Sequence, residues 1–230
     1  IIGVPIGLLV LFRLKSPKAD RKPDLGEYFQ IVMNTVKTKE LIVIYLITIF
    51  GLIMIWGSYI SYFPILMGIK IHQKPLIIGL IMTSMTLCSA LSSSQMGRLS
   101  KRFSSRLLLM LSFMLYCMAL LMIPFIEQRW LFLIPISIFG IAQGIFIPNL
   151  QYFLGKLSSM ENRGIVMALY GSSIRIGQAL GPLAMGLIFP VVGINGVFYV
   201  CSGIAFVMIA SISVLVDMKP NTGKEKLGRI

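Results

Sequence analysis

Long apolar runs separated by short polar stretches dominate the pattern of residues along this chain. The clearest run extends over 20 residues, Leu107–Ile126, and Ser112, Tyr116 and Cys117 are the residues that soften its apolar character. About 20 apolar residues in a helix cross a hydrocarbon core about 30 Å thick, whereas an open strand leaves its backbone groups unbonded there. The pattern therefore predicts an all-α membrane protein with spans at residues 40–63, 76–96, 106–126, 130–153, 163–189 and 194–217.

The stretches outside these spans divide the chain further. Its first residues, IIGVPIGLLVLF, are apolar but too few to span, and they lack an initiating Met and a preceding basic stretch, so we do not expect a signal peptide. We interpret residues 1–14 as the end of a truncated transmembrane helix and 15–39 as a cytoplasmic linker. Residues 40–218 form the six-helix unit, and residues 219–230 form a cytoplasmic tail.

The composition agrees with a multi-pass membrane protein. Hydrophobic residues make up 57% of the chain, charged residues make up 13%, and the mean hydropathy is +0.88. A soluble domain carries about 25% charged residues. The low charge and the blocked apolar runs together exclude one or two soluble domains of this length.

The positive charges predict an orientation in the membrane. If the linker is cytoplasmic, 17 of the 21 Lys and Arg residues lie on the cytoplasmic side and three on the other, a strong positive-inside bias. We therefore expect a multi-pass protein of the cell membrane with linker and C-terminus in the cytoplasm. The net charge of +13 then reflects topology and contact with anionic lipid headgroups. Nucleic acid is not an expected partner, because no folded, water-facing basic surface is evident.

The residues for enzymatic chemistry are scarce. His72 is the only histidine, the three cysteines are far apart within predicted spans, and no phosphate-binding glycine loop is present. We therefore expect no metal site, no catalytic residues, no cofactor and no nucleotide hydrolysis. A membrane-embedded enzyme, the alternative from another class, would need a buried His, Asp or Glu.

The segment GRLSKRFSSR, residues 97–106, resembles the signature loop G-x-L-a-D-R-x-G-R-[RK] of the major facilitator superfamily. Gly97, Leu99 and Arg102 match, while Lys101 and Ser104 replace the Asp and the second Gly. In that family the loop lies between helices 2 and 3 and, more degenerate, between helices 8 and 9. Two spans before it and four after it favour the second place.

Other segments resemble the same family in the same order. IIGVPIGLLVLF resembles the end of helix 6, SYFPILMG the outer end of helix 7, and RGIVMALYGSSIRIGQALGPLAMG helix 11. The resemblance implies the C-terminal six-helix half of a twelve-helix fold, with an N-terminal half as its partner. It further implies a secondary active transporter of small molecules that works by alternating access, most like the multidrug efflux antiporters driven by a proton gradient. Alternatives are a sugar or siderophore exporter, or a non-transporting membrane sensor or interaction protein.

The predicted span 163–189 carries two different faces. Small residues at helical spacing, which allow close helix packing, form the first face: Ser173, Gly177, Gly181 and Ala184. The second face is formed by Gly171, Arg175, Gln178 and Pro182. Gly177-xxx-Gly181-Pro182 also resembles the G-x-x-x-G-P motif of the antiporter branches, which implies a helix-packing role. Ser158 and Glu161 have the spacing of a capping box at the helix start.

Arg175 is the one charged residue well inside a predicted span. It lies about 12 residues from the cytoplasmic start, near mid-membrane at about 1.5 Å per residue. An Arg there costs about 2.5–3.5 kcal/mol on insertion scales. Our hypothesis is that Arg175 binds substrate or pairs with an acid in a cavity. The alternative is a structural arginine that snorkels or bonds to backbone carbonyls.

Further cavity candidates come from other spans. Tyr45, Thr48, Trp56 and Tyr59 share one face of the first span, which suits apolar or cationic compounds. Trp56 and Tyr59 fit an interfacial aromatic belt equally well. Gln143 in the fourth span is a candidate whose alternative role is hydrogen bonding between helices.

The basic loop has two possible roles. The family resemblance implies a cytoplasmic gating loop that includes Gly97, in which Arg98, Arg102 and Arg106 contact Glu161. Because Lys101 replaces the usual Asp, a simple topology signal is the alternative.

Overall fold

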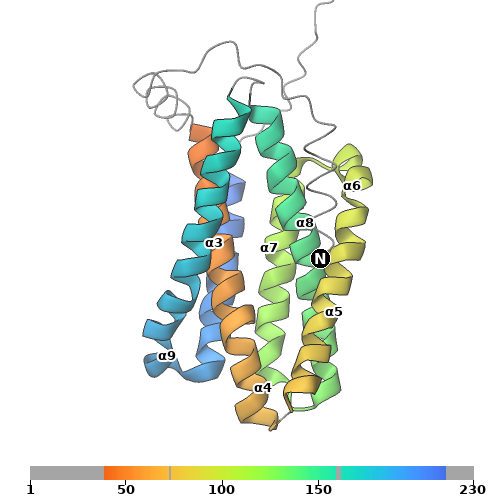
Figure 1. The fold of residues 1–230 in the computed structure, drawn as a ribbon, viewed down its shortest axis with the longest axis vertical. Coiled ribbons are helices and arrows are strands. Elements are labelled where there is room, and N and C mark those ends of the chain that lie inside the picture. The colour runs from red at the N-terminus through yellow and green to blue at the C-terminus, as the bar shows by residue number, and fades with distance from the viewer. Residues whose placement is uncertain (1–38, 73, 159–161, 216–230) are drawn as a thin grey trace, which may run out of the picture. The chain divides into compact units, whose positions relative to one another are not determined.

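The computed structural model describes residues 39–72, 74–158 and 162–215. The predictions for residues 1–14, for most of the linker and for the tail fall outside the described residues. The described residues are helical, and no strand occurs among them. This confirms the predicted all-α class (Figure 1).

The first span is one helical run with three parts. It consists of α3 (Lys39–Met54), a π-helical segment η1 (Ile55–Tyr62) and α4 (Phe63–Ile71). The helices that follow are α5 (Pro75–Ser94), α6 (Met96–Arg102), α7 (Ser105–Met122) and α8 (Leu133–Leu157), with the short 3₁₀ turns η2 (Ile123–Phe125) and η3 (Arg129–Phe132) flanking the α7–α8 connection. The last element is α9 (Arg163–Leu215).

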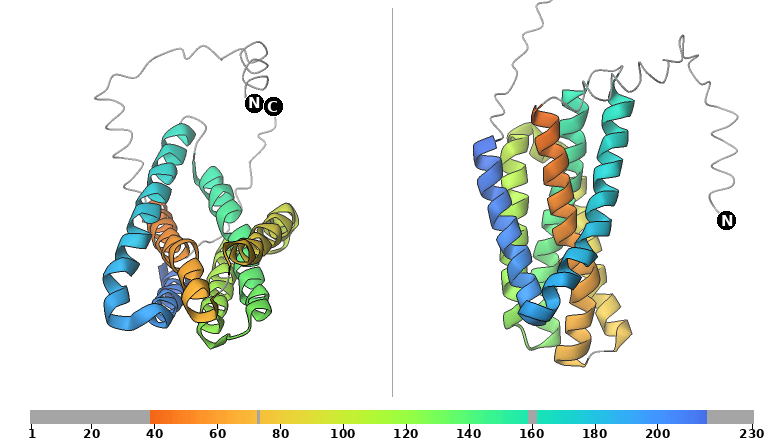
Figure 2. Two further views of the ribbon diagram at one scale, coloured as in Figure 1. Left: turned by 60° about the horizontal axis from the view of Figure 1, so that its bottom comes forward. Right: turned by 90° about the vertical axis from the view of Figure 1, so that its left-hand side faces the viewer.

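Five helical stretches of the described residues are long and apolar enough to cross a membrane. The fifth, Arg163–Val214, contains 52 residues, about 78 Å at 1.5 Å per residue, which is more than twice a hydrocarbon core. α9 joins two helices across a kink at Gly193, whose φ of 69° and ψ of −179° are not helical. Figure 2 shows the chain turning back there. Its two limbs correspond to the fifth and sixth predicted spans.

The predicted polar loop at 97–106 is partly helical instead. α5 ends at Ser94, and α6 occupies residues 96–102 before an extended turn at Phe103 and Ser104. The residues of α6 include Met, Leu, Lys and Arg, which favour helix. The Ser104 side chain accepts a hydrogen bond from the Leu107 backbone N–H at 3.3 Å and caps α7.

The packing order of the helices follows from where small residues and large apolar residues lie. α5 packs on α8, α7 packs between α8 and α9, and α9 packs on α3 and η1. Gly140 and Gly144 of α8 lie against the backbone of α5, so both contacts leave no room for a larger side chain. α5 contributes one buried side chain, Ile81, and its remaining apolar residues lie at least partly exposed.

Aromatic rings fill the core between the first span, α7 and α8. Tyr59 stacks on Phe63 and Phe139 with centroid distances of 5.7 and 5.0 Å. The cluster continues through edge-to-face contacts of Tyr116 with Phe139 and with Phe146. Such pairs stabilise the packing beyond their buried area, so this region holds the first span against α7 and α8.

Candidate functional site

The small-residue face of the first limb of α9 lies directly on α3 and η1. A Cβ atom placed on Gly177 would come within 2.6 Å of the Leu52 Cβ and 2.8 Å of the Ile49 carbonyl oxygen. The same atom on Gly181 would lie 2.8 Å from the Ile53 carbonyl oxygen. These distances are too short for real Cβ atoms, so both positions require glycine for the observed approach of the two backbones.

The second face of this limb carries the polar groups. The Arg175 guanidinium donates a hydrogen bond from Nη1 to Oε1 of Gln178 at 3.4 Å. Arg175 is exposed and Gln178 is half-buried. No described acidic residue forms an ion pair with Arg175, so among the described side chains its partner is a neutral amide.

Pro182 adds a backbone acceptor to this face. It lies inside α9 and has no N–H, so it cannot supply the helical hydrogen bond that the carbonyl four residues earlier, at Gln178, would accept. The turn that contains Arg175 and Gln178 therefore combines a cation, an amide and a carbonyl without its usual helical donor.

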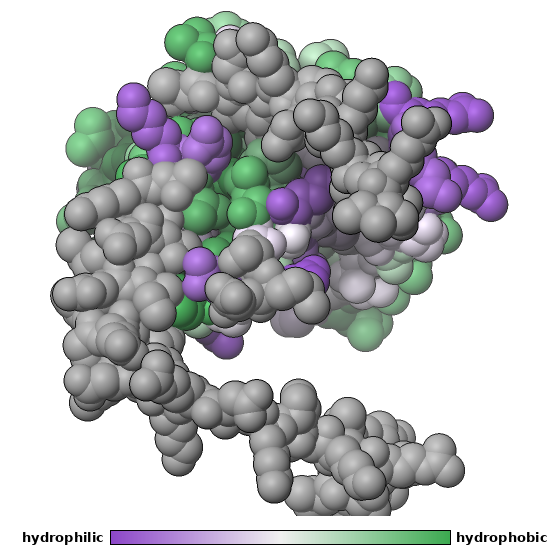
Figure 3. Space-filling view, turned by 90° about the horizontal axis from the view of Figure 1, so that it is seen from above, coloured by the Kyte–Doolittle hydropathy of each residue, from purple (hydrophilic) through white to green (hydrophobic). Residues whose placement is uncertain are grey.

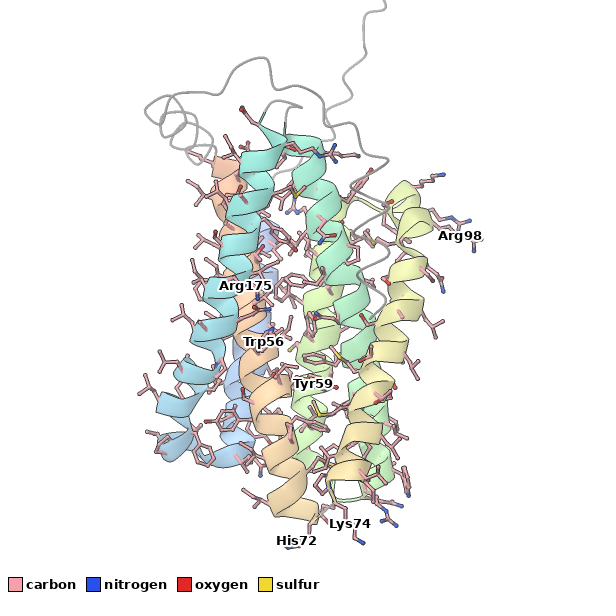
Figure 4. All side chains as sticks on the ribbon, viewed as in Figure 1. Trp56, Tyr59, His72, Lys74, Arg98 and Arg175 are labelled. Atoms are coloured by element: carbon pink, nitrogen blue, oxygen red, sulfur yellow. The ribbon has the colours of Figure 1, made fainter. Side chains whose placement is uncertain are left out.

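Trp56 lies on the neighbouring element η1. The Trp56 Cβ would be 3.2 Å from a Cβ on Gly181, so the first atom of its side chain lies against the α9 limb, and the side chain is half-buried. Figure 4 shows Arg175 and Trp56 on these adjacent helices. Trp56 thus meets the α9 limb at Gly181, and Arg175 and Gln178 form their own pair six and three residues earlier on the same limb.

The other three candidates of the first span have their hydroxyls bonded elsewhere. The Tyr45 hydroxyl donates to the Val166 carbonyl at 3.3 Å, and the Thr48 hydroxyl donates to the Ile44 carbonyl at 2.8 Å. Tyr59 is 3% exposed and stacks in the aromatic core. Since α3 is apolar on every side, its sequence does not distinguish a face that lines a cavity from one that packs on other helices.

Gln143 lies in a different part of the bundle. Its Oε1 accepts a hydrogen bond from the Tyr116 hydroxyl at 2.5 Å, and the side chain is half-buried. This bond joins α8 to α7, so Gln143 is not one of the groups gathered around Arg175.

The basic segment is split between two helices. Gly97, Arg98 and Arg102 lie on α6, and Arg98 points away from the helices (Figure 4). Arg106 is in the first turn of α7, and its Nη2 donates to the Ser213 backbone carbonyl of the second α9 limb. Glu161, the proposed partner of these arginines, lies outside the described residues. Ser158, the other residue of the predicted capping box, follows the end of α8 instead, and its hydroxyl donates to the Gly155 carbonyl at 3.4 Å.

Two features of this region were not predicted from the sequence. The first is the π-helix η1, which contains Trp56 and Tyr59; such segments are frequent at functional sites. Within it the Ser61 hydroxyl donates five residues back to the Trp56 carbonyl at 2.9 Å, and its residues carry no sequence signal that predicts a π-helix. The second is Tyr170, which is 4% exposed and whose hydroxyl has no hydrogen-bond partner among the described residues.

A protein family and several known proteins match this chain. The family model described as Major Facilitator Superfamily matches residues 45–229. The chain is 25% identical over 142 residues to the multidrug resistance protein MdtG of Proteus mirabilis, which is 61% of this chain and 35% of that protein. It is 26% identical over 151 residues to MdtG of Salmonella arizonae, or 65% of this chain and 37% of that protein.

An archaeal relative gives a similar match. The uncharacterized MFS-type transporter MJ1560 of Methanocaldococcus jannaschii is 28% identical over 152 residues, 65% of this chain and 39% of that protein. In each case the match covers well under half of the relative's length. The family model nevertheless covers most of this chain, including all of the helices α5 to α9 and most of the first span. The chain therefore belongs to the Major Facilitator Superfamily.

Proposed function

We propose that this chain is part of a secondary active transporter that exports small amphipathic molecules, in the manner of a multidrug efflux protein. The observation that carries the proposal is the division of the first α9 limb into a glycine face on α3 and a polar face with Arg175. The relatives named as multidrug resistance proteins support the export of drug-like compounds.

The polar face would bind the substrate. Arg175 offers a positive charge to a polar or anionic group, and the bond to Gln178 holds the guanidinium along the helix. Trp56, which meets the same limb at Gly181, would supply an apolar surface. A charged side chain within a span is costly in lipid and is a marker of a substrate pathway. In the proposed site, a cation near mid-membrane and an aromatic side chain would both contact the substrate.

The glycine face would permit movement. At Gly177 and Gly181 the α9 limb has no side chain in its contact with the first span. The two helices could therefore slide slightly past each other at these positions without separating interlocked side chains. In transporters built from two repeats, alternating access is largely rigid-body rocking around a mid-membrane site. The unpaired Tyr170 hydroxyl on the same limb would be free to bond in the alternative arrangement.

A proton gradient would drive this cycle. Among the described residues the acidic side chains Glu40 and Glu127 lie at helix ends or in connections. The carboxylate that exchanges the proton is therefore proposed to lie in another part of the protein, in the N-terminal half that pairs with this one in the family fold. The membrane would be the cell membrane, with the linker and tail in the cytoplasm.

Transport by the full-length protein in inverted membrane vesicles tests the proposal. An amphipathic fluorescent dye should accumulate when a proton gradient is applied, and a protonophore should abolish the accumulation. Arg175→Ala should reduce it at least about tenfold, the loss expected when about 1.4 kcal/mol of binding is removed. The control Ile176→Ala, at an exposed neighbour on the same limb, should leave it unchanged. Dye binding without gradient-dependent movement would instead favour a sensor.

A further inference from the structure

α6 and the turn after it form a small basic site outside the helix contacts described above. A pocket of about 450 Å³ is lined by Gln95, Arg98, Leu99, Lys101, Arg102 and Phe103. Three of these six residues are cations, and Arg98 and Arg102 are four residues apart, on one face of the helix. Figure 3, which views this end of the helices, shows hydrophilic side chains projecting at its margin.

The four described helices α5 to α8 contain no acidic residue that could neutralise these cations. The sequence contains no Asp or Glu between Glu40 and Glu127, so α5, α6 and α7 together carry only positive formal charge. α6 packs on α8, whose one charged residue is Lys156. The cations on α6 therefore have no acidic partner on these four helices, and an anion that binds them would come from outside these helices.

The position of the pocket identifies the source of that anion. α6 begins two residues after α5 ends, and the apolar side chains Leu87 and Leu91 near that end are 62% and 66% exposed. The hydrocarbon core thus gives way to the headgroup layer close to α6. Phe103 is 48% exposed among the cations, and a combination of Lys and Arg with Phe or Leu is typical of segments that lie at the membrane interface.

Arg98 does not serve the interior of the bundle. It points away from the helices (Figure 4), whereas Arg106, at the start of α7, is bonded to the second α9 limb. The two arginines therefore divide the basic segment into one part that ties helices together and one part that faces outward.

We propose that α6 and the Phe103 turn bind the phosphate headgroup of an anionic phospholipid such as phosphatidylglycerol. Arg98 and Arg102 contact the phosphate oxygens, Lys101 adds charge, and Phe103 anchors the turn beside the acyl chains. Lipid binding at this site would depend on the charge and position of α6 and not on which molecule the protein transports.

Native mass spectrometry of the full-length protein with added phosphatidylglycerol or phosphatidylcholine tests the site. The wild type should retain phosphatidylglycerol preferentially. Arg98→Gln/Arg102→Gln should weaken its binding roughly 10- to 30-fold, as expected for two interfacial cations. Arg98→Lys/Arg102→Lys should retain binding, which shows that the fold tolerates changes at both positions.

A matched control removes two charges from the opposite end of the helices. Lys74→Gln/Arg129→Gln, at two exposed positions, should bind phosphatidylglycerol like the wild type. Equal binding by wild type and Arg98→Gln/Arg102→Gln would overturn the proposal. Displacement of the lipid by millimolar inorganic phosphate would also overturn it, because the site would then be one for a free anion.

Discussion

The phenolic hydroxyl of Tyr59 donates a hydrogen bond to the backbone carbonyl of Met82 at 2.9 Å. This bond joins the π-helical segment of the first span to the middle of α5. α5 has one buried side chain of its own, so a specific polar tie is a substantial part of what holds it to the first span.

Tyr59→Phe should therefore loosen α5 selectively. The substitution keeps the ring that stacks on Phe63 and Phe139 and removes one hydrogen bond, at a cost of about 0.5–1.5 kcal/mol. Hydrogen exchange should show faster exchange of α5 amides with little change in α7. The control Tyr62→Phe, whose ring packs on Phe189, should leave α5 unchanged, and equal effects of the two variants would contradict the assignment.

Gly177→Ala should separate the α9 limb from α3. The added methyl group would meet Leu52 and the Ile49 carbonyl, and overpacking of this kind costs about 1–3 kcal/mol. Thermal unfolding in detergent should show a lower midpoint, and transport should fall with it. Gly171→Ala is a matched control on the same limb, because a Cβ there meets nothing within 4 Å; a midpoint lowered as far by this control would refute the explanation.

Gln178→Glu should abolish the free positive charge of the site. The new carboxylate would lie where Oε1 now accepts from Arg175 at 3.4 Å, and an ion pair would form. If Arg175 binds substrate through its charge, dye transport should fall about tenfold, the equivalent of about 1.4 kcal/mol. Gln178→Met, which leaves the cation uncompensated, should retain more transport than Gln178→Glu. The reverse order in a vesicle assay would show that the amide, not the charge, matters.

Gly193→Ala should destabilise the turn between the two α9 limbs. The φ of 69° and ψ of −179° at Gly193 lie in a region that essentially only glycine adopts, and holding another residue there costs about 1–3 kcal/mol. A lower midpoint of thermal unfolding is expected. Gly203→Ala, inside the second limb and in open space, should be neutral or stabilising, because Ala favours helix over Gly.

The number and approximate limits of the spans were predictable because the length of each apolar run can be read directly from the sequence. The fifth and sixth predicted spans meet close to Gly193, where the two limbs of α9 join. The prediction of a loop at 97–106 was wrong for residues 97–102, because the charge of a segment does not determine whether its backbone is helical.

Which way polar side chains point in the first span could not be read from the sequence. Tyr45, Thr48 and Tyr59 share a face by spacing, yet each hydroxyl reaches a backbone carbonyl, one of them in its own helix. A helix surrounded by lipid and other apolar helices has no polar side that would reveal its rotation. The contact of Arg175 with Gln178 was predictable in outline, because residues three apart are neighbours on a helix.

The π-helical segment η1 has a consequence for how the first span tolerates changes in length. Each π-turn holds a residue more than an α-turn does. Deleting one residue within Ile55–Tyr62 would let the segment close to an α-helix while Phe63 and Leu66 of α4 keep their direction. The same deletion within α3 would turn every later side chain of the span by about 100°. The first span thus contains one stretch in which a residue can be lost without rotating the side chains that follow it around the helix axis.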